Sequence, residues 1–127
     1  LVSLVAPTIA LGNTVVAIPS PVHPLAATDF YTVLESSDVP AGVVNVVTGD
    51  REALARTLAE HDDVDGVWYV GSREGVHAVE LASASNMKRT WCETDDARDW
   101  MDVRAGEGRE FLRRATEVKN VWIPYGE

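Results

Sequence analysis

The stretch Gly66-Val67-Trp68-Tyr69-Val70-Gly71-Ser72 decides the fold that we predict for this chain. Its first five residues form a continuous apolar run, which is typical of a strand buried on both faces of a parallel sheet. Residues 73–84 then repeat apolar side chains at helical spacing, and Ser72 is a suitable N-cap for a helix that begins there. We therefore expect a buried strand, a tight turn and a helix, the repeating unit of an α/β fold.

The same unit recurs on both sides of this stretch. Three further apolar runs rich in β-branched residues predict strands at 14–18, 43–47 and 88–92. Segments of helical period predict helices at 1–11, 25–36 and 51–60, the last with Asp50 as its N-cap. Strands that alternate with helices imply right-handed crossovers, so we expect an α/β fold with a doubly wound, Rossmann-like parallel sheet.

The pattern changes after Cys92, and we divide the chain into residues 1–93 and 94–127. Residues 94–107 hold many carboxylates and few large aliphatic side chains, which predicts a loop or an irregular crossing. The acidic run at 93–102 could also bind a cation, but it lacks the spacing of a calcium loop, so we interpret it as a solvated loop. Beyond it we predict a helix at about 108–116 and a terminal strand at 118–124.

The length and charge of the chain limit its possible functions. A chain of 127 residues is expected to form one compact domain, and its net charge of -9 repels phosphate groups. We therefore expect neither nucleic acid nor a membrane as a partner, and the apolar opening at 1–11 is shorter than the ~20 residues that span a bilayer. Because the chain begins with Leu rather than Met, we expect a fragment or a cut domain.

The cysteine and histidine content predicts a reducing, cytoplasmic compartment and no metal site. A single cysteine cannot form an internal disulfide, which fits a reducing, cytoplasmic location. The three histidines are scattered, so we predict no metal site. The four tryptophans could form a stacking surface for a ligand, but we interpret them as core and interface anchors: Trp68, Trp91, Trp100 and Trp122.

Several segments, in order, resemble the aldehyde dehydrogenase superfamily. The longest is A-P-T-I-A-L-G-N-T-V-V-A-I-P-S at 6–20, which is similar to that family's A-P-A-L-A-A-G-N-T-V-V-x-K-P-[SA]. The likeness continues through V-P-A-G-V-V-N-V-V-T-G at 39–49, H-D-D-V-D at 61–65, Y-V-G-S at 69–72 and N-M-K-R at 86–89. It covers residues 1–93 and implies the NAD(P)-binding domain of an enzyme that oxidises aldehydes to acids.

The resemblance implies cofactor contacts at Gly49, Gly71 and Ser72, where Ser72 matches the residue that meets the cofactor pyrophosphate. As a residue that opens a helix, Ser72 is also explained as a simple N-cap. Other positions depart from the family. The lysine that binds the adenosine ribose falls on Ile18, the acidic residue after it on Pro21, and the second glycine of a G-x-G motif on Arg51, a long cation that narrows the adenine side of the cleft.

The catalytic residues implied by the resemblance are incomplete. Glu93 matches the family's general base, but Thr-Asp-Asp-Ala at 94–97 replaces the glycines that follow it in the family. The family's nucleophilic cysteine follows a G-Q-x-C motif in another domain, and the sequence has none. We interpret Cys92, inside a predicted strand, as a buried structural thiol. We therefore assign no catalytic residue.

After Glu93 the chain continues directly to residues 98–127 and the ending V-W-I-P-Y-G-E, where most family members continue into a catalytic domain. This arrangement resembles the carboxyl-terminal, degenerate half of the two-part (family sixteen) aldehyde dehydrogenases. This implies a non-catalytic domain with a structural or oligomerisation role, whose partners are the catalytic half of a parent chain and further copies of itself. One alternative is the NAD- or NADP-binding segment of an active enzyme with Glu93 as base. Another is a regulatory module that binds a small anion at Ser72.

Overall fold

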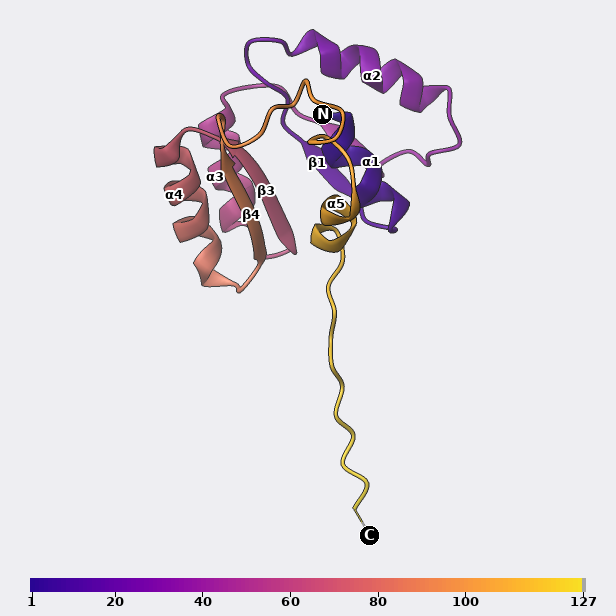
Figure 1. Ribbon diagram of the computed structural model, residues 1–127, viewed down its shortest axis with the longest axis vertical. Helices are drawn as coiled ribbons and strands as arrows, with labels where there is room; N and C mark the ends of the chain where they lie inside the picture. Colours follow the sequence, from indigo (N-terminus) through magenta and orange to yellow (C-terminus); the bar gives the residue numbers. More distant parts are fainter. Residues whose placement is uncertain (127) are drawn as a thin grey trace.

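The computed structural model describes residues 1–126, in which helices alternate with parallel strands (Figure 1). The helices and strands predicted within residues 1–116 are confirmed, with small shifts at their ends, as is the loop that follows the fourth strand. In chain order they are α1 (Val2–Ala10), β1 (Val15–Ala17), α2 (Leu25–Glu35), β2 (Val44–Val46), α3 (Arg51–Glu60), β3 (Gly66–Gly71), α4 (Arg73–Ala82), the 3-10 turn η1 (Ser83–Ser85), β4 (Arg89–Thr94) and α5 (Arg109–Arg114).

The strands form two parallel pairs. β1 pairs with β2 in the register Val15 to Val44, and β3 pairs with β4 in the register Gly66 to Arg89. The α/β class with parallel strands is confirmed. Among residues 1–126, however, no backbone ladder joins the two pairs, so the sheet is divided where we expected it to be continuous.

Each strand pair has its own apolar core. Helices α3 and α4 cover one face of β3–β4, where Ala55 and Ala59 pack beside Val67, Tyr69 and Val79. Small side chains on α3 let this helix approach the sheet closely. The second core holds Val5, Ala17 and Val44, with half-buried side chains of α2 around them.

The segment after β4 folds back onto the opposite face of β3–β4. Successive strand residues point to opposite faces, so Trp68 and Trp91 project away from α3 and α4. Phe111 of α5 is buried against Trp91, with the ring centroids 5.3 Å apart and the rings edge to face. The Nδ2 of Asn13 also donates a hydrogen bond to the carbonyl of Ala115, which ties the end of α5 to the turn after α1.

The predicted terminal strand at 118–124 is wrong. Within the described residues, no helix or strand follows Arg114, and residues 116–126 extend away from the body (Figure 1). A strand needs a neighbour to accept its backbone hydrogen bonds, and none of the strands described in residues 1–126 pairs with this segment. Trp122, which we expected to be an anchor, is 91% exposed, whereas Trp91 is buried.

None of the described helices is long and apolar enough to cross a membrane.

Candidate functional site

The carboxyl end of β3 carries the predicted pyrophosphate residues. Gly71 is the last residue of the strand, and Ser72 precedes α4 with an extended backbone. The Ser72 hydroxyl accepts a hydrogen bond from the backbone N–H of Gly75 at 3.0 Å. Ser72 is therefore the N-cap of α4, as one of the two interpretations predicted, and an anion contact at this residue stays a prediction.

Asp50 caps α3 in the same way, because its carboxylate accepts a hydrogen bond from the N–H of Ala53 at 2.8 Å. Gly49, predicted to contact cofactor, lies just before this cap in an exposed turn. A Cβ at Gly49 would stand 3.1 Å from a methyl group of Leu54, so any side chain at this position requires Leu54 to move slightly.

Tyr69 fills the space beside Gly71 at the end of β3 and Gly75 in the first turn of α4. Its hydroxyl lies where a Cβ of residue 71 or residue 75 would stand, so both positions require glycine. Tyr69 is only 4% exposed, and its hydroxyl donates to the Glu52 carboxylate at 2.7 to 2.8 Å. Burial and the neighbouring Glu52 carboxylate raise the pKa of Tyr69 to about 12.

Arg51 spans from α3 to the end of β3. Its guanidinium donates to the carbonyl of Val70 at 3.3 Å and lies 3.7 Å from the Asp95 carboxylate. It also stands over the ring of Tyr69, 5.8 Å from the ring centroid. The expectation that Arg51 narrows the adenine side of a cofactor cleft stays a prediction.

The inner side of the β3–α4 turn has no room for a dinucleotide pyrophosphate, while Ser72 at the start of α4 is exposed. A phosphate at a helix N-terminus needs glycines that leave space for close approach to backbone N–H groups. At α4, the space beside Gly71 and Gly75 is filled by Tyr69, and the Glu52 carboxylate stands 2.6 Å from the position of a Gly75 Cβ. A second anion placed there would be repelled by that carboxylate.

Glu93, the residue that matches a general base, is held by three hydrogen bonds. Its carboxylate accepts from the Trp91 indole N–H at 3.1 Å and from two nitrogens of Arg98 at 3.0 and 2.8 Å. The side chain is 19% exposed. The hydrogen bonds from Arg98 hold the pKa of the Glu93 carboxyl below its usual range.

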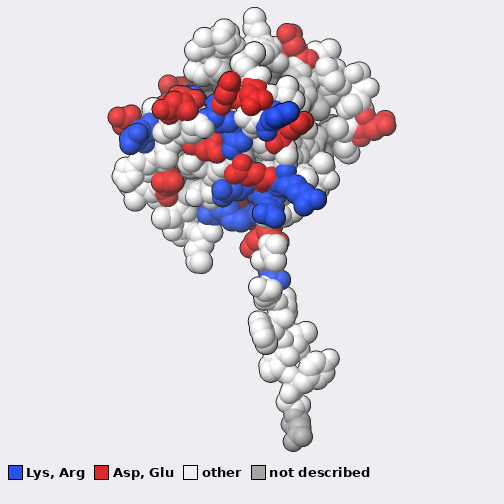
Figure 2. Space-filling model, in the orientation of Figure 1, with Lys and Arg blue, Asp and Glu red and all other residues white. Residues whose placement is uncertain are grey.

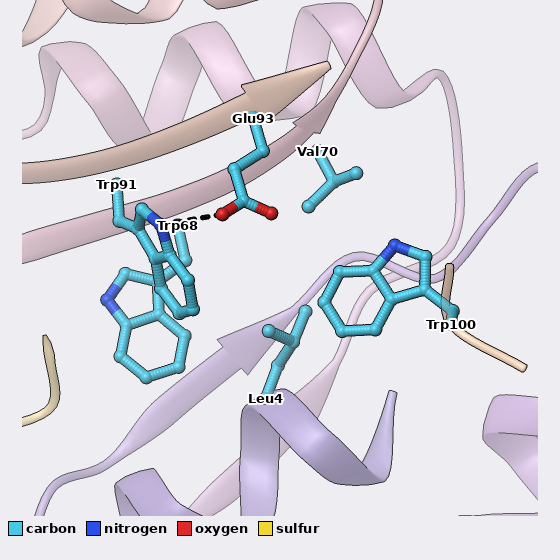
Figure 3. A pocket seen from close by; sticks show the side chains of 6 residues that line it. All are labelled: Leu4, Trp68, Val70, Trp91, Glu93 and Trp100. Carbon is cyan, nitrogen blue, oxygen red and sulfur yellow. Dashed lines mark hydrogen bonds between the residues drawn. The ribbon is translucent and has the colours of Figure 1, made fainter. Parts of the chain in front are cut away.

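The space beside Glu93 is small. A cavity of about 10 Å³ lies between α1 and the outer face of β3–β4, with room for about one water molecule. Figure 3 shows the carboxylate with the indoles of Trp91 and Trp100 on either side and Leu4 below it. The lining residues are Leu4, Trp68, Val70, Trp91, Glu93 and Trp100.

Arg98, the side chain that pairs with Glu93, was not identified from the sequence. Besides Glu93, it contacts the Glu110 carboxylate at 3.0 Å and donates to the carbonyl of Ala105 at 2.7 Å. Its charge could have identified it in the sequence, because Arg98 is the only basic residue between Arg89 and Arg104. A lone cation within an acidic run is a candidate for an internal ion pair.

Cys92 is half-buried and packs against the core beneath α4. Burial and the nearby Glu80 carboxylate raise the pKa of the Cys92 thiol to about 11. The thiol therefore stays protonated at neutral pH, whereas nucleophilic attack requires the thiolate. Within residues 1–126, no group of three His, Cys, Asp or Glu side chains is placed to hold a metal ion.

Comparison with known proteins identifies the family. The family model described as "Aldehyde dehydrogenase family" matches residues 1–97. The chain belongs to the aldehyde dehydrogenase family. The match ends close to the point where the acidic loop begins.

Individual relatives agree with this assignment. NADP/NAD-dependent aldehyde dehydrogenase PuuC of Escherichia coli (strain K12) is 39% identical over 88 residues, which are 68% of this chain and 18% of that protein. Human cytosolic 10-formyltetrahydrofolate dehydrogenase is 38% identical over 82 residues, which are 64% of this chain and 9% of that protein. The chain thus spans less than a fifth of the length of these relatives.

Solved aldehyde dehydrogenases share the fold. A mutant of aldehyde dehydrogenase C from Pseudomonas syringae, complexed with NAD+ and octanal, aligns with a TM-score of 0.70 and 36% identity. The alignment covers 72% of this chain and 19% of that enzyme. KauB of Pseudomonas aeruginosa aligns with a TM-score of 0.68 and 33% identity, over 72% of this chain and 19% of that enzyme.

Proposed function

We propose that this chain is a non-catalytic domain of an aldehyde dehydrogenase family protein, with a structural role in supporting a catalytic unit and forming subunit contacts. This agrees with its resemblance to the degenerate half of the two-part enzymes. The observation that carries the proposal is the hydrogen-bonded ion pair between Glu93 and Arg98, which occupies the carboxylate that would act as base.

The state of Glu93 argues against general-base catalysis. A general base works best with a pKa near the operating pH, and it must reach the proton that it removes. Arg98 lowers the pKa of Glu93 and covers both of its oxygens. The adjacent cavity of about 10 Å³ leaves no space for an aldehyde beside the carboxylate.

Side chains at the carboxyl ends of β1 and β3 argue against NAD or NADP as a bound cofactor of this domain. Tyr69 and Glu52 take up the space beside Gly71 and Gly75, and Arg51 covers the end of β3. Ile18 supplies no hydrogen-bond donor for a ribose hydroxyl. Leaving a buried hydroxyl without a partner costs about 1 to 3 kcal/mol.

The exposed terminal segment supports a role in assembly. Its apolar side chains are largely in water, and Tyr125 is 99% exposed. Figure 2 shows Lys and Arg side chains gathered where this segment leaves the body. A shallow hollow on α5 is lined by Glu110, Arg113 and Arg114. Apolar groups rimmed by charge are typical of contact surfaces, so we propose the catalytic half of a parent chain and further copies as partners. As part of the same proposal, we assign the protein to the cytoplasm, since a single cysteine that forms no internal disulfide fits a reducing compartment.

An activity assay tests the catalytic part of this proposal. We expect no NADH when the chain is mixed with NAD+ and octanal, the ligands of the P. syringae neighbour. PuuC with an aldehyde that it oxidises serves as the positive control. NADH formation that Glu93→Gln abolishes would support the enzymatic alternative and overturn the proposal.

Sedimentation velocity tests the assembly part. We expect the chain to self-associate and a version ending at Glu117 to remain monomeric, because the truncation removes the exposed apolar segment. Equal masses for the two proteins would contradict a role for this segment in contacts between copies.

A further inference from the structure

Three aromatic rings surround the guanidinium of Arg98. The distances from its central carbon to the ring centroids are 5.4 Å for Trp91, 5.5 Å for Trp100 and 5.2 Å for Phe111. All three lie within the ~6 Å over which a cation is attracted to an aromatic ring. The Arg98 side chain is 15% exposed, so these rings act on a largely dehydrated cation.

Polar groups complete the enclosure. Glu93 receives two hydrogen bonds from the Nε and a terminal nitrogen of Arg98. That terminal nitrogen also donates to Glu110, and the other donates to the carbonyl of Ala105. All three nitrogens of the planar cation thus have an acceptor within 3.0 Å.

The walls come from separate parts of the chain. Trp91 and Glu93 lie on β4, Trp100 and Ala105 on the loop that follows, and Glu110 and Phe111 on α5. Each of these groups contacts the Arg98 guanidinium, and Trp91 and Glu110 also contact Arg114, at 5.2 Å from the Trp91 ring centroid and 3.8 Å from the Glu110 carboxylate. The directions of the acceptors suit a planar fork of donors, which an ammonium group does not present.

We propose that Trp91, Glu93, Trp100, Glu110 and Phe111 form a guanidinium-binding site whose resident ligand is Arg98, and that this internal ligand holds residues 94–116 on the β3–β4 face. The ligand class is a planar guanidinium cation. The site does not depend on whether the domain is catalytic.

A chemical-rescue experiment on the 127-residue chain tests the site. Arg98→Gly removes the internal ligand and is expected to lower the melting temperature. Guanidinium chloride at millimolar concentration, far below the molar range in which it denatures proteins, should restore most of that loss in a saturable way. Ammonium and sodium chloride at the same ionic strength should restore little, because neither cation offers the planar fork.

Arg104→Gly is the matched control, since Arg104 lies on the same loop and its side chain is exposed. Its melting temperature should not respond to guanidinium beyond the response to sodium. Arg98→Lys keeps the charge and loses the fork, so its melting temperature should fall between those of the wild type and Arg98→Gly. An equal response of Arg98→Gly to all three salts would overturn the proposal.

Nuclear magnetic resonance of the wild-type chain keeps the proposal testable if Arg98→Gly does not fold. The rings should shift the Arg98 Nε–H signal upfield of the other arginines, and its hydrogen bond to Glu93 should slow exchange with water. In Trp100→Ala, which removes one ring and keeps Arg98, the upfield shift should decrease. An Arg98 signal that coincides with those of the exposed arginines and exchanges as quickly would contradict the enclosed site.

Discussion

The hydroxyl of Tyr69 on β3 lies within hydrogen-bond distance of both carboxylate oxygens of Glu52 on α3, at 2.8 and 2.7 Å. This contact lies beside Gly71 and Gly75. Because of it, the Tyr69 and Glu52 side chains occupy the space next to these two glycines.

Removing the Tyr69 hydroxyl tests this contact. Tyr69→Phe keeps the ring in the core and deletes the donor, so we expect the free energy of unfolding to fall by about 1 kcal/mol. Urea unfolding measures the change. Tyr31→Phe is the matched control and should leave stability nearly unchanged, because the Tyr31 side chain is exposed and its hydroxyl makes no hydrogen bond within the part of the chain that the structure describes.

The raised pKa of Tyr69 predicts a loss of stability in strong alkali. Its folded-state pKa of about 12 exceeds the ordinary value of 10.0, so folding favours the protonated phenol. The resulting stabilisation is complete below pH 10 and is lost as the pH rises through about 12. Unfolding monitored against pH should show a smaller alkaline loss for Tyr69→Phe than for the wild type. An equal alkaline loss of stability in the two proteins would contradict a raised pKa of Tyr69.

Gly75 should not tolerate a methyl group. Its Cβ would coincide with the Tyr69 hydroxyl and crowd the Glu52 carboxylate, so we expect Gly75→Ala to lower stability by about 1 to 3 kcal/mol. Gly126→Ala, where nothing lies within 4 Å of a new Cβ, is the control. Thermal melts compare the two, and equal melting temperatures would contradict the close packing at α4.

Glu93 should stabilise the fold through Arg98. Because its folded-state pKa is lowered, its contribution is present above the unfolded-state pKa and is lost as the pH falls through the folded-state pKa. Glu93→Gln should cost about 1 to 3 kcal/mol at neutral pH, since Arg98 loses its charged acceptor, and the variant should lose less stability in acid. Urea unfolding at neutral and acid pH checks both expectations, and an unchanged acid dependence would contradict them.

Two tryptophans should behave in opposite ways. Trp91→Ala removes a buried ring that contacts Trp68 and Phe111, and we expect it to cost about 3 to 5 kcal/mol. Trp122→Ala should change the melting temperature of the isolated chain very little, because that side chain is 91% exposed. A large loss in Trp122→Ala would mean that the terminal segment packs on the body.

Local sequence patterns predicted the elements well. The apolar runs and helical periods at 14–92 depend on neighbouring residues, and hydrogen bonds within four residues fix the caps at Asp50 and Ser72. The terminal segment misled the prediction because Val121-Trp122-Ile123 has strand-like composition, whereas a strand also needs a partner in space.

The contents of the site depend on contacts between distant residues. Tyr69 and Glu52 are 17 positions apart, and Arg98 and Glu110 are 12 apart. No sequence periodicity predicts that Tyr69 packs beside Gly71 and Gly75. None predicts that the Arg98 side chain lies among three aromatic rings. The resemblance indicated where a cofactor would bind in the family, and only the packed side chains indicate what fills that position here.

Titration of the chain with NAD+ and NADP+, monitored by tryptophan fluorescence and calorimetry, tests the central claim most directly. We predict no saturable signal at millimolar cofactor, because Tyr69, Glu52 and Arg51 occupy the strand ends. Saturable quenching with heat release at micromolar NAD+ or NADP+ would contradict the account and restore the dehydrogenase interpretation.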